Sequence, residues 1–120
     1  MNLTRKLTAL GDGQCAEAFV EAYLHGDGWE PLARNWRGGG AEVDLVVGRD
    51  GVVRLVEVKA RQPGDDSGLE AVGPEKQRRL RRAGEAWLAE HGPVVEIAFM
   101  VALVTLTEGV WGLELIDDAF

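Results

Sequence analysis

The sequence is poor in the residues that form disulfides and zinc sites. It has one cysteine and two histidines among 120 residues, and it contains neither a CxxC nor an HExxH motif. A single cysteine excludes an internal disulfide and is typical of proteins from a reducing compartment, so we expect a cytoplasmic location. The same scarcity disfavours a zinc site built from soft ligands.

Long apolar segments are also absent. No run of about 18 apolar residues occurs, and the opening segment, MNLTRKLTAL, has no continuous apolar core of signal-peptide length. We therefore expect no membrane-spanning segment and no membrane partner. The longest apolar stretch, IAFMVALV, has the length of a strand.

The charge balance is acidic. A formal net charge of −7 argues against a general nucleic-acid coat, so any nucleic acid must bind at a local basic patch. The chain is 46% hydrophobic and 28% charged, which is typical of a globular protein. Its length suits one domain, so we expect residues 1–120 to form a single unit.

Apolar periodicity predicts two helices and five strands. The helices are expected from about Cys15 to Leu24 and over residues 74–92. The strands are expected at residues 30–36, 41–48, 52–59, 95–106 and 110–116. The order of helix, three strands, helix and two strands indicates an α/β domain in which helices flank a mixed central sheet.

The second and third expected strands carry charges where apolar residues would be favoured. They join at GRDG, and an even loop centred on its Arg-Asp pair would place Asp44 opposite Leu55. Because side chains alternate along a strand, Glu42 would then face Glu57 directly. Asp44 would lie on a diagonal from Glu57, with about 7–8 Å between the backbones. Lys59 shares this face, whereas an odd loop would break the register.

Carboxylates gathered on one face repel each other, and burying them unpaired is costly. A divalent cation resolves the conflict, because Mg²⁺ takes oxygen ligands from one or two carboxylates, from water and from phosphate. A metal-bound water beside a lysine is suited to phosphodiester hydrolysis. The alternative interpretation is an exposed hairpin whose charges form ordinary cross-strand pairs and deter aggregation.

Short motifs in a fixed order extend along nearly the whole chain. They are AE at 16–17, YL at 23–24, RNWR at 34–37, AEVDLV at 41–46, LVEVKAR at 55–61, K..RL at 76–80 and the terminal IDDAF. Together they resemble the YraN family of small bacterial proteins of unassigned function. That family is similar to the restriction-endonuclease-like PD-(D/E)xK group, which is related to archaeal Holliday-junction resolvases. The AEVDLV and VEVKAR segments are the specific part of the resemblance.

The resemblance implies a metal-dependent nuclease with a restriction-endonuclease-like fold. Asp44 and Glu57 would be ligands of Mg²⁺ or Mn²⁺, and the main-chain carbonyl of Val58 would be a third. Lys59 would position or activate the attacking water and stabilise the transition state. Glu17 matches an acid that reaches the same metal in related resolvases.

The chain also departs from the family pattern. Alanine precedes Glu17 and Glu42 where the family usually has glycine, and the strand VEIAFMV lacks an aspartate that the family often carries there. Glu42 itself matches a family glutamate whose role is open. None of these departures affects Asp44, Glu57 or Lys59.

Basic residues cluster in one segment of the second expected helix, at Lys76, Arg78, Arg79, Arg81 and Arg82. We expect Lys76 and Arg79 to contact phosphates, together with Arg37 and Arg61 beside the hairpin. The alternative is a solvated face whose charges pair with glutamates of the same helix.

Most of the remaining distinctive side chains are expected in the interior. The four tryptophans are interpreted as packing residues, with Trp36 as the one candidate for stacking on a base. Cys15 has no nearby histidine to act as its base, so it is predicted to be a small buried residue.

Three functions remain open from these observations. The first is a Mg²⁺- or Mn²⁺-dependent nuclease acting on DNA rather than RNA, including branched or processed DNA. The second is a catalytically silent nucleic-acid-binding module of the same fold, and the third is an interaction domain that docks a partner through its acidic surface. The resolvase relatives act as dimers, so a homodimer is a further option.

Overall fold

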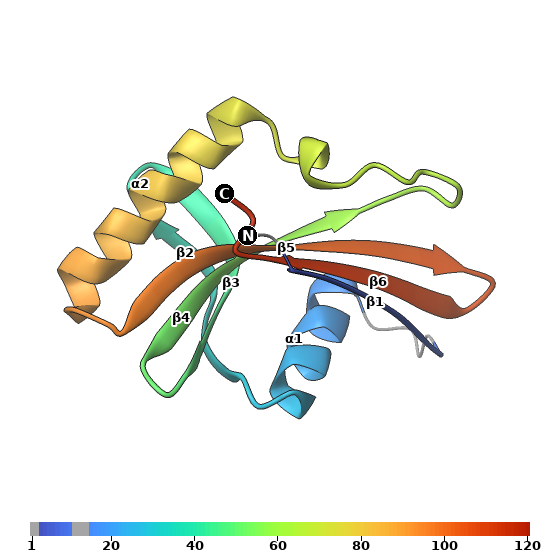
Figure 1. Ribbon diagram of the computed structural model, residues 1–120, viewed down its shortest axis with the longest axis horizontal. Helices are drawn as coiled ribbons and strands as arrows, with labels where there is room; N and C mark the ends of the chain where they lie inside the picture. The colour runs from blue at the N-terminus through green and yellow to red at the C-terminus, as the bar shows by residue number, and fades with distance from the viewer. Residues whose placement is uncertain (1–2, 11–14) are drawn as a thin grey trace.

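Six strands form one mixed sheet with a helix against each face (Figure 1). The computed structural model describes residues 3–10 and 15–120, with side chains from Cys15 onward. The helices are α1 (Ala16–Gly26) and α2 (Pro74–His91), and a short 3-10 helix, η1 (Leu69–Ala71), precedes α2. The strands are β1 (Leu3–Leu10), β2 (Glu30–Gly38), β3 (Ala41–Arg49), β4 (Val52–Ala60), β5 (Glu96–Thr107) and β6 (Val110–Asp117).

The strand order is β1-β6-β5-β4-β3-β2, and the central neighbours β4 and β5 run parallel while the other neighbours are antiparallel. Parallel neighbours need a crossover connection, which here contains α2. The predicted α/β class, with a mixed sheet flanked by helices, is confirmed. Within the described ranges, no helix is long and apolar enough to cross a membrane.

The sheet contains one strand more than periodicity predicts. β1 pairs antiparallel with β6 along its whole length, from Leu3 opposite Asp117 to Leu10 opposite Val110. Its sequence, LTRKLTAL, has no regular alternation of apolar and polar residues. An edge strand needs a partner on one side only. The pairing of β1 therefore depends on β6, and the apolar pattern of β1 itself gives little sign of a strand.

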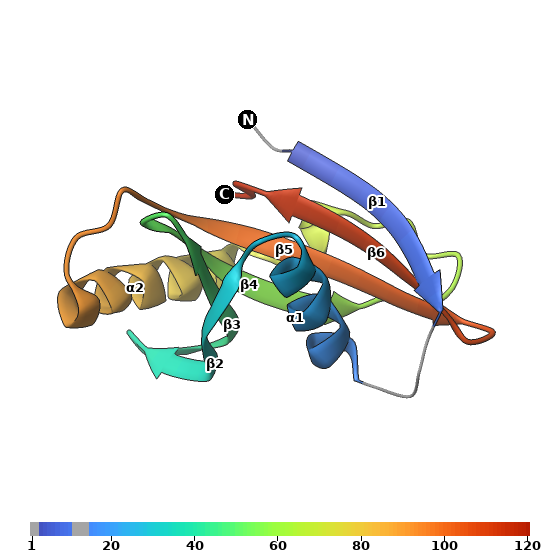
Figure 2. The same cartoon turned by 90° about the horizontal axis from the view of Figure 1, so that it is seen from below.

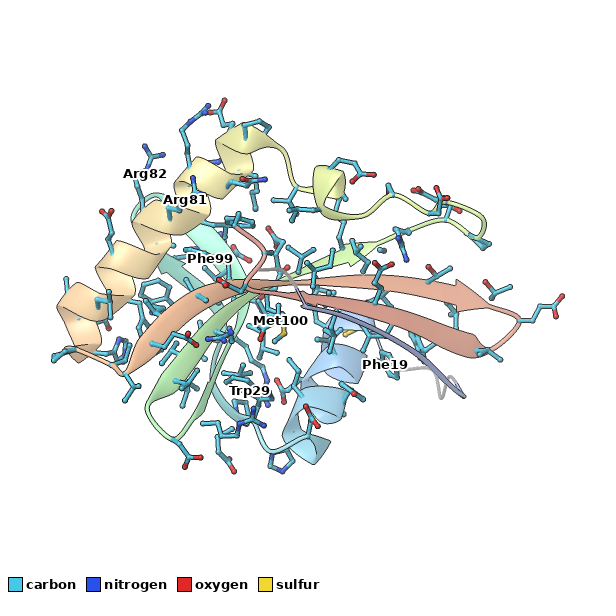
Figure 3. The ribbon with its side chains drawn as sticks, viewed as in Figure 1. Phe19, Trp29, Arg81, Arg82, Phe99 and Met100 are labelled. Carbon is cyan, nitrogen blue, oxygen red and sulfur yellow. The ribbon has the colours of Figure 1, made fainter. Side chains whose placement is uncertain are left out.

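Each face of the sheet has its own apolar core, with α1 covering one and α2 the other (Figure 2). Phe19, Trp29 and Met100 belong to the core on the α1 side, whereas Phe99 packs against the core under α2 (Figure 3). The two neighbouring β5 residues therefore point to opposite faces, as strand geometry requires.

The tryptophans pack as predicted. Trp29, Trp87 and Trp111 are each less than 8% exposed. Trp36 is half-buried, and its ring meets that of Trp87 edge-on with 5.1 Å between centroids.

The hairpin register differs from the predicted one. β3 and β4 are joined by a two-residue turn, Asp50–Gly51, in which both residues have positive φ, as a type I′ turn requires. Leu45 pairs with Val56, so the predicted pairing of Asp44 with Leu55 is wrong by two residues. The loop is centred one residue later than expected, because the Asp-Gly pair forms the turn.

Candidate metal centre

Asp44 lies where β3 and β4 separate, directly beyond the Leu45–Val56 pair at which their ladder ends. Its Oδ2 accepts a hydrogen bond from the main-chain N–H of Val58 at 2.8 Å. The side chain thus satisfies a strand N–H that β3 would otherwise bond through its backbone. Because the N–H and C=O of one residue point to the same side of a strand, the Val58 carbonyl is also directed toward this gap.

Glu57 is buried on the neighbouring strand, with only 8% of its surface exposed. Its Oε2 is 3.0 Å from the Lys76 Nζ of α2. Burial raises the pKa of Glu57 to about 7, with a further contribution from the carboxylate of Asp44 and against the opposing effect of Lys76. The two carboxylates are therefore short of positive charge, and a divalent cation between them would favour their ionised forms.

Arg54 provides a contrast, because it is the other charged side chain that is buried among those described. Its guanidinium has two carboxylate partners, Asp117 at 2.6 Å and Glu96 at 2.8 Å. The charge of Arg54 is thus compensated within the protein. Among the side chains that the structure describes, the Asp44 and Glu57 pair has one cationic partner, Lys76, which sets this pair apart.

A hollow of about 360 Å³ opens over the two carboxylates. It is lined by Asp44, Glu57, Val58, Lys59, Ala71, Val72, Gly73 and Lys76, so η1 and the start of α2 form its roof. Among the described side chains, no cluster of three or more His, Cys, Asp or Glu residues could hold a metal. Two carboxylates and one main-chain carbonyl suit Mg²⁺ or Mn²⁺, because Mg²⁺ keeps several waters and demands few protein ligands.

Lys59 lies at the mouth of this hollow. Its side chain is exposed and forms no ion pair with any side chain that the structure describes. An unpaired ammonium beside two carboxylates is available to an anionic group that binds there. The structure therefore brings five of the predicted residues together: Asp44, Glu57, Val58, Lys59 and, from α2, Lys76.

Glu17 lies elsewhere, on α1 and thus against the opposite face of the sheet. It lines a second groove, about 620 Å³ in volume, between α1 and β2. Asp44 lines both the groove and the hollow, so the two spaces meet at this residue. Glu17 is consequently a neighbour of the candidate centre across Asp44, not part of the hollow that contains Glu57.

Glu42 does not face Glu57, contrary to the register expected from sequence. It pairs with Arg37 across the β2–β3 hairpin, where Glu42 Oε2 is 2.8 Å from Arg37 Nη2. The expected like-charge contact is thus replaced by an ordinary cross-strand ion pair. Arg37 remains 82% exposed, so it stays accessible at this hairpin.

The predicted phosphate-binding residues have different surroundings. Arg61 is half-buried, donates to the Ser67 carbonyl and lies 3.3 Å from Glu114, so it anchors the loop that leads to η1. Arg79 is exposed, as are its neighbours Arg78 and Arg82, and none of the three forms an ion pair within the described part of the chain. Arg82 extends from α2 away from the sheet (Figure 3). The expected alternative, pairing with glutamates of the same helix, is not observed for these three.

Two residues near the centre have positions that sequence reasoning did not predict. Cys15 is exposed, not buried, because it is the N-cap of α1, with its Sγ accepting from the Ala18 N–H at 3.5 Å. Asn35 has a positive φ of 49° within β2, beside Asp44 in the lining of the groove. An asparagine inside a strand is a weak signal for such a backbone irregularity, and the RNWR motif offered no other.

The fold and this site define a small α/β protein with a paired-carboxylate hollow at the separation of two central strands. Residues 16–104 match the family described as uncharacterised protein family UPF0102, and the chain belongs to that family. The matched span contains the residues of the hollow and those of the α1–β2 groove except Cys15.

Several bacterial relatives share most of this span. A UPF0102 protein of Synechococcus sp. (strain JA-3-3Ab) is 46% identical over 101 residues, which cover 81% of this chain and 77% of the relative. UPF0102 protein gll3754 of Gloeobacter violaceus is 47% identical over 93 residues, or 74% of each chain. A UPF0102 protein of Mycolicibacterium gilvum is 46% identical over 91 residues, with 73% of this chain and 74% of the relative covered.

Proposed function

We propose that this protein is a metal-dependent nuclease that hydrolyses phosphodiester bonds in DNA and belongs to the restriction-endonuclease-like group, as its resemblance to the YraN family implies. One observation carries the proposal. Asp44, Glu57 and Lys59 converge on one hollow, where the Val58 N–H fixes the Asp44 carboxylate and the charge of the two acids is incompletely compensated.

The residues of the hollow suggest a division of labour. Asp44, Glu57 and the Val58 carbonyl would hold Mg²⁺ or Mn²⁺, which when bound supplies an acidified water and stabilises charge on the phosphate. The exposed ammonium of Lys59 can donate to the attacking water or to a phosphate oxygen as negative charge develops there.

Helix α2 supports the choice of a nucleic acid as substrate. Lys76 reaches the hollow, and the exposed guanidinium groups of Arg78, Arg79 and Arg82 follow it along the helix. Since the chain as a whole is acidic, this basic segment gives the phosphate backbone one preferred side from which to approach.

The proposal is tested by cleavage of labelled duplex, single-stranded and four-way-junction DNA in Mg²⁺ or Mn²⁺. We expect metal-dependent cutting by the wild type, and a loss of about 100-fold or more in Asp44→Asn and Lys59→Met. Asp50→Asn is the matched control, because it makes the same chemical change in the turn of the same hairpin, where asparagine tolerates the positive φ.

Two results would overturn the proposal. Equal cutting by the wild type and Asp44→Asn would mean that the activity arises outside the hollow. No cutting of any of the DNA substrates by wild-type protein would leave no role for the hollow in hydrolysis.

A second candidate function is favoured by the ion pair between Lys76 and Glu57, at 3.0 Å. In a catalytically silent nucleic-acid-binding module of this fold, the ammonium of Lys76 would take the place of the cation permanently. Calorimetric titration with Mn²⁺ separates the two candidates. Binding by the wild type that is lost in Asp44→Asn supports the nuclease, whereas equal and negligible binding by both supports the silent module.

A further inference from the structure

Apart from Asp44, the residues that line the groove between α1 and β2 have no part in the hydrolysis proposed above. The groove has a volume of about 620 Å³, which falls within the range typical of small-molecule sites. Ala18, Ala22, Pro31 and Leu45 give it apolar walls. Because Asp44 lines both the groove and the hollow, a ligand whose phosphate reached the hollow could extend directly into the groove.

The charges of the groove exclude a phosphate. Glu17, Glu21, Glu30 and Asp44 all line it, and the basic residues against them are Arg34 and His25. The Arg34 guanidinium is already bound to Glu21 through both carboxylate oxygens, at 2.5 and 2.6 Å. Because Asp44 is assigned to the metal, Glu17 and Glu30 remain. Their carboxylates are acceptors only, so they select a neutral or cationic group that brings its own hydrogen-bond donors.

Asn35 adds a directional polar group to the same wall. It occupies β2 between residues that pair regularly with β3, Arg34 with Leu45 and Trp36 with Val43, yet its own φ is +49°. A left-handed backbone is uncommon for a residue other than glycine, and such outliers concentrate at ligand sites. The exposed amide offers one acceptor and two donors, the set that reads the edge of a base.

We propose that the α1–β2 groove binds an unpaired nucleobase next to the phosphate that is cleaved, so that the preferred substrate is DNA with an unpaired nucleotide at the cleavage position. This rests on the proposed function for the identity of the polymer. A base is planar, apolar on its faces and uncharged, and it carries donors at its edge, which matches each property of the groove. A paired base cannot enter, because its edge is occupied and its faces are stacked.

The carboxylates of the groove predict which bases are preferred. Glutamate and aspartate accept from the exocyclic amino group of cytosine, and an asparagine amide pairs with adenine. Thymine has no exocyclic amino group. Cytosine and adenine should therefore bind the groove about tenfold more tightly than thymine does, a ratio expected from one well-formed polar contact.

Binding of free nucleosides tests the groove without metal, phosphate or catalysis. We would titrate ¹⁵N-labelled protein with deoxycytidine, deoxyadenosine and thymidine and follow the amide shifts. Shifts at Ala18, Ala22 and Asn35 are expected, with thymidine the weakest ligand. They should be lost in Ala22→Trp, which fills the groove from an exposed helical position. Ala89→Trp, the same change at an exposed position of α2, should leave them intact.

Asn35→Gly provides a second variant, which removes the amide and keeps the backbone conformation. Glycine accepts the positive φ at no cost, so the fold should be at least as stable as in the wild type. Loss of the base preference in this variant would assign the preference to the amide. No groove shifts with any nucleoside, or identical shifts in Ala22→Trp, would overturn the proposal.

Cleavage assays then test base binding in the groove separately from nuclease activity. On a duplex with one unpaired cytosine, Ala22→Trp should cut about tenfold more slowly than the wild type and Ala89→Trp at the wild-type rate, a difference of the size expected for one base contact. If Ala22→Trp cut this DNA at the wild-type rate, the proposal that the groove binds a base would be overturned and the proposed nuclease activity would stand. If nucleosides bound in the groove but no DNA were cleaved, the base-binding proposal would stand and the proposed nuclease activity would be overturned.

Discussion

The main-chain N–H of Val58 donates to the Oδ2 of Asp44 at 2.8 Å, across the gap where β3 leaves β4. One side chain thereby does two things. It satisfies a strand N–H that has lost its main-chain partner, and it holds a carboxylate beside Glu57 in a fixed orientation. The geometry of the candidate centre is thus part of the backbone hydrogen bonding of the sheet.

This dual role predicts different stabilities for two substitutions that both remove the charge. Asp44→Asn keeps an oxygen that accepts from Val58, whereas Asp44→Ala leaves that N–H without an acceptor. We expect Asp44→Ala to be less stable than Asp44→Asn by about 1–2 kcal/mol. Urea unfolding of both variants in EDTA measures the difference. Equal stabilities would show that the hydrogen bond contributes nothing to the stability of the fold. In a separate titration, both variants should lose Mn²⁺ binding to the same extent.

Glu57→Gln should stabilise the metal-free protein in a pH-dependent way. The pKa of Glu57 is raised from 4.5 to about 7, so the folded protein retains a proton that the unfolded chain releases between these values. Ionised Glu57 therefore costs stability; the cost is absent below pH 4.5, grows as the pH rises to 7 and is full above it. We expect Glu57→Gln to be more stable than the wild type by about 3 kcal/mol at pH 8, with little gain at pH 4.5.

Urea unfolding at the two pH values in EDTA checks this prediction, with Glu90→Gln as the control at an exposed position of α2. A gain that is the same at both pH values, or that also appears in Glu90→Gln, would contradict it. The expected result, a more stable protein without metal binding, would identify Glu57 as a residue retained for function at a cost in stability.

The sequence predicts most of this architecture because its elements have strong local signals. The periodic face of α2, the apolar alternation of β3, β4 and β6 and the continuous apolar run of β5 each predict their element without tertiary contacts. β1 lacks such a signal, because its place in the sheet is decided by β6. The predicted register of the β3–β4 hairpin is wrong for a local reason. The Asp-Gly pair, not the Arg-Asp pair, adopts the two positive φ angles of the turn.

The candidate site is predicted in its residue types and not in its geometry. Alternation correctly places Glu57 and Lys59 near Asp44, but it cannot predict that β3 leaves the ladder after Leu45. It also cannot predict that Lys76, on α2, comes within 3.0 Å of Glu57, since that contact depends on how the helix crosses the sheet. Long-range placement of this kind is set by the packing of the core.

The exposed arginines of α2 should contribute to DNA binding through counterion release. Arg79 has no ion pair within the described residues, so Arg79→Gln removes a charge that is available to a phosphate. We expect the slope of log Kd against log salt concentration to fall by about 1 in magnitude. Arg49→Gln is the control, because Arg49 is bound to the Asp27 carbonyl at 2.8 Å and lies over the Trp29 ring. Equal slopes for Arg79→Gln and the wild type would remove α2 from the DNA interface.

Two adjacent glycines at the tip of the β2–β3 hairpin test whether that tip positions α2. Gly39 and Gly40 both have positive φ, of 61° and 83°, so alanine is strained at either position. A Cβ at Gly39 would also come within 2.5 Å of the main-chain carbonyl of Arg82, whereas at Gly40 it would meet nothing within 4 Å. The hairpin tip therefore touches the backbone of α2 at Gly39, with no room for a side chain.

Gly40→Ala should consequently cost about 1 kcal/mol, the strain of the left-handed backbone alone. Gly39→Ala should cost about 3 kcal/mol, because either the hairpin or α2 must also move. Thermal unfolding of the two variants compares them directly, and salt-dependent DNA binding adds a functional readout. Since α2 carries Lys76 and the exposed arginines, its displacement in Gly39→Ala should weaken DNA binding while Gly40→Ala binds as the wild type does. Equal losses of stability in the two variants would mean that the contact with Arg82 does not hold the helix in place.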